Sequence, residues 1–232
     1  MSPAPDRLKT SAAVLTTVNL ACAAIGAAQG LAVVRLLGPE GYGAAAILVS
    51  LTSVAANLID VRLTDLVSNL YYSPDGSDDV RGAAYRASAL RLGIGLYAVS
   101  APLIMLASAA LMVMGARHLS TTPFLTEWFW LAAAAQGISY VGSFFVFIQR
   151  FVTSTARMAA VQVTSALLNA GAMLAAVTAH RTVGGYVTGL FLSAVAITAV
   201  NAVLTIRSVR RAGIPLLQRG RHSEVAIDRA SL

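Results

Sequence analysis

The residues best suited to chemistry are charged and amide side chains that interrupt long apolar stretches. Asn57 and Asp60 lie three residues apart, and a helix that turns about 100° per residue places them on one face. Arg62 follows two positions later, and Arg35 ends the preceding apolar stretch. Arginine binds phosphate and carboxylate oxygens through a planar set of N–H donors. These four residues are therefore the candidates for contacts to a polar or anionic ligand.

Each candidate also has an ordinary structural interpretation. An arginine near the end of a spanning helix extends its charge to the membrane surface. This interpretation applies to Arg35, and to Arg62 with Asp60 as the carboxylate that balances it. Amides inside a membrane also join helices by hydrogen bonds. Interhelical bonding and a polar cavity both remain open for the other amides of the apolar stretches, Asn19, Gln29, Gln136, Gln162, Asn169 and Asn201.

Catalytic and metal-binding patterns are missing from the sequence. The three histidines are widely separated, and the single cysteine, Cys22, cannot form an intrachain disulfide. Neither a phosphate-binding loop nor a dinucleotide fingerprint is found. We therefore expect no enzyme activity, no metal site and no cofactor.

The composition indicates an integral membrane protein. Of 232 residues, 57% are hydrophobic and 12% are charged, against roughly 45–50% and about 25% in soluble domains. The mean hydropathy is +0.71. These values argue against a soluble domain and predict an all-α integral membrane protein in contact with membrane lipids. The net charge of +7 is then explained by membrane orientation rather than by a nucleic-acid partner.

Six apolar stretches are long enough to cross a bilayer. The turn-forming segment 38–43, with Gly38, Gly41 and Gly43, predicts a loop between the first two spans. A short basic connector is expected at 149–157. The six spans are expected at about 11–34, 44–60, 92–114, 127–148, 158–179 and 183–206.

Basic residues fix the expected orientation and the division of the chain. With the N-terminus inside, 14 of the 17 basic residues lie in cytoplasmic segments, and Arg35, Arg117 and Arg181 lie outside. This asymmetry predicts an N-in/C-in protein with six spans. The chain then divides into a cytoplasmic N-terminal segment, a transmembrane lobe and a basic cytoplasmic tail, at 1–10, 11–206 and 207–232.

Two glycine pairs at i and i+4 spacing, Gly26 with Gly30 and Gly185 with Gly189, allow helices to approach closely. With 18 glycines in the chain, such pairs also occur by chance. Generic packing within the bundle is the expected role.

A family resemblance appears at VRLLGPEGYG, residues 34–43. It resembles the first inter-helix loop of polysaccharide-biosynthesis membrane proteins, the O-antigen and exopolysaccharide flippases of the multidrug/oligosaccharidyl-lipid/polysaccharide (MOP) superfamily. Residues 58–63 (LIDVRL) resemble the family's Leu-x-Asp-x-Gly-Leu motif, with Arg62 where glycine is usual.

Two later segments extend this likeness over about residues 11–206. Residues 147–151 (FIQRF), with Arg157, resemble the basic connector before the fifth helix. Residues 183–189 (VGGYVTG) resemble the glycine-rich start of the sixth. The loop motif is the most specific of the four.

The resemblance implies a fold and an activity. Family members move lipid-linked sugars by alternating access between two lobes of about six helices, across a cavity that is often cationic and holds the lipid pyrophosphate. This chain matches one lobe, the N-terminal one. The implied setting is the bacterial inner membrane, with a second six-helix subunit or a homodimer completing the transporter, or else a truncated product that does not transport.

The resemblance carries over to few residues. Arg35 is a candidate cavity cation, and Gly38, Gly41 and Gly43 are the turn glycines. Arg62 departs from the family pattern: it adds a cation if it faces the cavity, and otherwise its helix packs differently.

Two alternative functions belong to other classes. One is a non-transporting membrane scaffold of a polysaccharide assembly complex, which needs no polar cavity. The other is half of a multidrug-exporter-like antiporter, which needs carboxylates inside the membrane. Only Asp60 and Asp65 qualify for that role.

Overall fold

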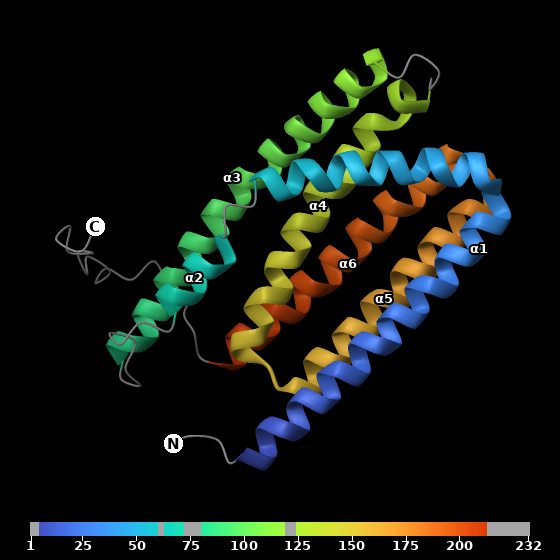
Figure 1. Ribbon diagram of the computed structural model, residues 1–232. Helices are drawn as coiled ribbons and strands as arrows, with labels where there is room; N and C mark the ends of the chain where they lie inside the picture. Colours follow the sequence, from blue (N-terminus) through green and yellow to red (C-terminus); the bar gives the residue numbers. More distant parts are fainter. Residues whose placement is uncertain (1–4, 60–62, 72–79, 119–123, 213–232) are drawn as a thin grey trace.

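The computed structural model describes residues 5–59, 63–71, 80–118 and 124–212. Within these ranges the fold is all-helical, as predicted, and five helices are long and apolar enough to cross a membrane. In Figure 1, α3, α4, α5 and α6 run alongside one another. Asp60 and Arg62 lie outside the described residues. The helices are α1 (Pro5–Ile59), α2 (Leu63–Tyr71), α3 (Val80–His118), α4 (Phe124–Val152), α5 (Thr155–Ala179) and α6 (Val183–Arg211).

The predicted loop at 38–43 is too long, because a single residue, Gly38, makes the turn. Helix α1 departs from helical geometry at Gly38 (φ 73°, ψ 170°). Glycine adopts a positive φ without the steric cost of a side chain. Pro39 follows, and proline at a first helical position loses no hydrogen bond because that N–H has no helical partner. Gly41 and Gly43 therefore lie in helix rather than in a turn.

The kink makes α1 two helices in practice. Its apolar part, Ala13–Leu58, has 46 residues, about 69 Å of helix against about 30 Å of bilayer core. The segment before Gly38 lies along α5, and the segment after it crosses α4 and α6 (Figure 1). Each segment has the length that one crossing requires.

The predicted connector at 149–157 is also too long. Helix α4 continues to Val152 and α5 starts at Thr155, so the turn consists of Thr153 and Ser154. The reason is Gln149, which is 1% exposed. Its side-chain Nε2 donates to α6, as described below, and this bond favours helix at that position over a solvated loop.

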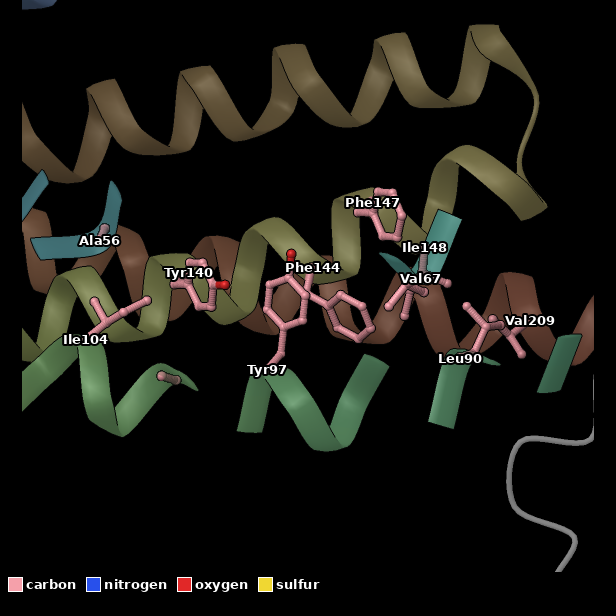
Figure 2. Close-up of a cluster of buried hydrophobic side chains, with 11 residues drawn as sticks. Ala56, Val67, Leu90, Tyr97, Ile104, Tyr140, Phe144, Phe147, Ile148 and Val209 are labelled. Atoms are coloured by element: carbon pink, nitrogen blue, oxygen red, sulfur yellow. The ribbon is translucent and has the colours of Figure 1, made fainter. Parts of the chain in front are cut away.

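An aromatic stack joins α3 to α4. The Tyr97 ring lies 4.7 Å from the Tyr140 ring and 4.2 Å from the Phe144 ring, measured between centroids. Figure 2 shows Tyr97 reaching from α3 toward both α4 rings, and Val67 of α2 packing into the same cluster. Offset aromatic pairs add roughly 0.5–1.5 kcal/mol each beyond area burial.

The two predicted glycine pairs behave differently. A Cβ at Gly189 would lie 3.0 Å from Met173 Cα, so this glycine lets α6 approach α5. A Cβ at Gly185 would meet the His180 carbonyl of the preceding turn. A Cβ at Gly26 or Gly30 would meet nothing within 4 Å. Close packing therefore uses the second pair and not the first.

Gly142 offers a direct test of the α4–α6 contact. A Cβ there would lie 2.6 Å from Thr198 Oγ1, which is held by a hydrogen bond to the Ile138 carbonyl. Gly142→Ala should therefore destabilise the protein by about 1–3 kcal/mol through overpacking. Thermal unfolding in detergent, followed by tryptophan fluorescence, measures the change.

Gly171→Ala is the matched control, because a Cβ at Gly171 meets nothing within 4 Å. It should stabilise helix α5 by about 0.5–1 kcal/mol. Equal melting temperatures for the two variants would contradict the close α4–α6 contact.

Candidate functional site: a polar groove between α4, α5 and α6

Helices α4, α5 and α6 enclose a groove of about 590 Å³. Helix α6 packs against both α4 and α5, whereas α4 and α5 scarcely touch, so α6 forms the floor and the other two form the walls. Both segments of α1 contribute lining residues. The polar and charged lining residues are Asn19, Thr52, Gln136, Ser139, Ser143, Arg150, Gln162, Ser165, Asn169, Ser193, Thr198 and Asn201.

Helical spacing explains why these side chains meet. Gln136, Ser139, Ser143 and Arg150 follow one another at steps of three, four and seven residues along α4, which keeps them on one face. The stretch from Gln136 to Arg150 covers about 21 Å of helix. Gln136 lies at the end crossed by α1, and Arg150 lies in the last turn of α4.

Five of the polar side chains that line the groove already donate hydrogen bonds: Thr52, Ser143, Asn169, Ser193 and Thr198. Thr198 Oγ1 donates to the Ile138 carbonyl at 3.0 Å and ties α6 to α4. Asn169 Nδ2 donates to Gln29 Oε1 at 3.2 Å and ties α5 to α1. For this amide pair, the predicted interhelical hydrogen bond is therefore confirmed.

Two amide oxygens are exceptions. Gln162 Oε1 and Asn201 Oδ1 are buried and have no hydrogen-bond partner, and Asn201 is only 1% exposed. An acceptor left without a donor costs about 1–3 kcal/mol. Both residues line the groove, so a ligand in the groove lies beside both amides.

Hydrogen bonds place Asn201 near the Arg150 end of the groove. Gln149 Nε2 donates to the Asn201 carbonyl at 3.2 Å and to Thr205 Oγ1 at 3.0 Å. Since Gln149 precedes Arg150 in α4, Arg150 and Asn201 lie at one level of the bundle. Gln162 lies seven residues into α5, about 10 Å from the helix start, in the same half of the groove.

The groove is lined mainly by uncharged polar side chains. Arg150 is its only charged lining residue among the residues that the structure describes, and none of the lining residues is acidic. The described ranges hold no group of three or more His, Cys, Asp or Glu side chains that could bind a metal. This chemistry suits hydroxyl groups and one anionic group.

The two predicted ligand contacts that the structure describes, Arg35 and Asn57, do not line this groove. Arg35 is exposed, three residues before the kink at Gly38, and does not line the groove. Asn57 is exposed and lines a neighbouring hollow of about 260 Å³. Gln136 lines both spaces. The ligand-contact roles of Arg35, Asn57, Asp60 and Arg62 therefore remain predictions.

Sequence reasoning found part of the groove and missed part. Five of the six amides singled out above line it, Gln29 being the one that instead bonds to a lining residue. It missed Arg150, which was assigned to a loop, and the hydroxyls Ser139 and Ser143. Their spacing of three and four residues in an otherwise apolar helix was the available signal.

Comparison with protein-family models, with curated proteins and with solved structures finds no match to this chain. The family resemblance stands on the sequence segments quoted for it.

The native thiol of Cys22 can be used to measure the access of water-soluble reagents to the groove. It is the only cysteine, it is partly exposed, and it lines the groove. A thiol reacts as its thiolate, which apolar surroundings disfavour. Cys22 should therefore react faster with a hydrophilic maleimide than a thiol on the outer apolar face of the same helix.

The matched control is Leu20→Cys in a Cys22→Ser background. Leu20 is 67% exposed on the apolar surface, and lipid would shield a thiol there from a hydrophilic reagent. Labelling rates of both proteins in membranes measure the difference. Equal or faster labelling at position 20 would show that water does not enter the groove.

Proposed function

We propose that this chain is a half-length relative of polysaccharide flippases. It assists the translocation of lipid-linked oligosaccharide across the bacterial inner membrane by alternating access and does no chemistry on the sugar. The observation that carries the proposal is the polar groove, which has one arginine and no acidic lining residue among the described residues. A sugar headgroup with a phosphate presents the complementary hydroxyls and negative charge.

The dimensions of the groove support a headgroup-sized ligand. Its volume of about 590 Å³ lies within the usual range of roughly 300–1,000 Å³ for small-molecule sites. The surrounding helices expose large apolar side chains, including Leu20, Leu167 and Leu192. Such a surface allows a prenyl tail to stay in lipid while the polar headgroup enters the groove.

In this proposal the six spans run N-in/C-in and form one lobe of a two-lobe machine. A second six-helix subunit or a second copy of the chain supplies the other lobe, as in transporters built from two repeats. Arg35 and Arg62 contact phosphate, and Asp60 with Asn57 lines or gates the path.

The two alternative functions receive less support. An antiporter coupled to cations needs a carboxylate in its cavity, and none of the described residues that line the groove is acidic. A scaffold has no use for two buried amide oxygens without donors, because each costs stability.

The predicted anion contacts can be tested by charge removal. Arg35→Ala and Arg62→Ala should each reduce glycan export at least about tenfold in a complementation assay, because a charge-assisted bond contributes about 1.5–3 kcal/mol. Membrane levels of the variants should not change.

Arg181→Ala is the control: like Arg35 it is exposed and does not line the groove, but it lies in the turn between α5 and α6, outside the segments quoted for the family resemblance. It should export normally. Normal export by both the Arg35 and Arg62 variants would remove these residues from the mechanism.

The proposed orientation predicts opposite labelling of two exposed arginine positions. In a Cys22→Ser background, Arg181→Cys should react with an impermeant maleimide in intact cells, because Arg181 lies outside. Arg157→Cys, at the start of α5, should react only after the membrane is permeabilised. The reverse pattern would overturn the N-in/C-in arrangement.

A further inference from the structure

We propose that Gln162 and Asn201 form a hydroxyl-recognition subsite that distinguishes ligands with free sugar hydroxyls from ligands without them. The inference rests on the proposed function and deepens it, because it assigns the sugar part of the ligand to two residues. Neither residue was a predicted ligand contact.

The two orphan oxygens define the chemistry of the partner. An amide oxygen can only accept a hydrogen bond, so Gln162 Oε1 and Asn201 Oδ1 need a donor. Carboxylates and phosphodiesters offer only acceptors at neutral pH and cannot fill this role. An ammonium group donates, but the Arg150 guanidinium at the same level of the groove repels a second cation. Neutral hydroxyl groups remain as the suitable donors.

Asn201 is held in place before any ligand arrives. On its N-terminal side, Thr198 Oγ1 donates to the Ile138 carbonyl at 3.0 Å. On its C-terminal side, Thr205 Oγ1 donates to the Phe145 carbonyl at 3.0 Å. Gln149 also donates to the Asn201 carbonyl itself. Three hydrogen bonds to α4 therefore fix this part of α6. Because Asn201 is already ordered, ligand binding costs little conformational entropy there.

Arg150 supplies the complementary anion contact. It lines the groove from the last turn of α4 and is exposed. A ligand with a phosphate beside Arg150 and a sugar extending toward Asn201 and Gln162 satisfies all three groups. The subsite therefore takes a glycosyl phosphate, carried on a lipid in the proposed function.

A site built around buried acceptors discriminates strongly between ligands that carry hydrogen-bond donors and ligands that lack them. A ligand whose hydroxyls are methylated keeps its acceptor oxygens but loses its donors, so it leaves both amide oxygens unpaired, and such losses are costly. Selectivity for free hydroxyls over methyl ethers is thus the measurable signature.

The experiment measures binding to the full chain in phosphatidylcholine nanodiscs, which avoid the sugar hydroxyls of maltoside detergents. The probes are dodecyl phosphoglucose, the same compound with its four free hydroxyls methylated, and dodecyl phosphate. The wild-type protein should bind the hydroxylated probe about tenfold more tightly than the methylated one. Protection of Cys22 from alkylation gives a second readout of occupancy in the groove.

Two near-isosteric variants remove the acceptors. Asn201→Leu and Gln162→Met should each lower the affinity ratio of the two glucosyl probes, and the double variant should bring it close to one, while dodecyl phosphate binding stays at the wild-type level. Neither variant should melt below wild type, because each replaces an unsatisfied polar atom by an apolar one. Arg150→Gln should weaken all three probes and leave the ratio unchanged.

Thr178→Val is the matched control from α5. Thr178 does not line the groove, and its hydroxyl donates to the Leu174 carbonyl of its own helix at 2.7 Å. It should keep the full preference for the hydroxylated probe.

Three outcomes would overturn the subsite. They are no preference in the wild type, an unchanged preference in both amide variants, or an equal loss of all three probes in those variants. The subsite and the proposed function fail separately. Selective binding without glycan export in cells would refute translocation alone, and export without selective binding would refute the subsite alone.

Discussion

The arrangement depends on one seam, the contact between α4 and α6. Gly142 removes a side chain where Thr198 must fit, and Thr198 and Thr205 donate to α4 carbonyls from α6. Gln149 donates in the opposite direction. In lipid the hydrophobic effect does not drive two apolar helices together, because lipid tails are as apolar as the helices. Close packing of small residues and interhelical hydrogen bonds must therefore hold the helices together. Here the seam uses both, and it sets the floor and one wall of the groove.

The other wall follows from the same seam and from the kink in α1. Helix α6 also receives α5, with Gly189 facing Met173, and α5 is joined to the first segment of α1 through Asn169 and Gln29. At Gly38 the chain turns, and the second segment of α1 crosses the far end of α4. Because α4 and α5 are held by α6 rather than by each other, the space between them stays open along much of their length.

The sequence predicts the helical class well and the local turns poorly. The apolar stretches identify the spanning helices because lipid demands internally bonded backbone over about 20 residues. Composition cannot show that Gly38 alone suffices for a turn, since its neighbours at 39–43 are equally typical of a loop. It also cannot show that Gln149 is buried against α6, because that depends on which helix lies opposite.

The candidate site shows the same division. The amides in apolar helices indicated either a cavity or interhelical bonds, and the structure contains both: Asn169 bonds to Gln29, whereas Gln162 and Asn201 leave oxygens free. Which amide plays which role depends on the donor across the interface, and a single sequence does not record that partner. The hydroxyls of α4 are a different case, since their helical period was visible in the sequence.

The open groove constrains how the chain sits in a membrane. Its polar lining cannot face hydrocarbon, because each unpaired polar group there costs several kcal/mol. The outer faces of the same helices carry large exposed apolar side chains and suit lipid. The bundle therefore has an apolar exterior and a polar groove. The opening of the groove must be covered by water, a ligand or another polypeptide. In the proposed function a second lobe meets that requirement and also encloses a ligand between two walls, so the cost of an open polar groove in lipid is an argument for that part of the proposal.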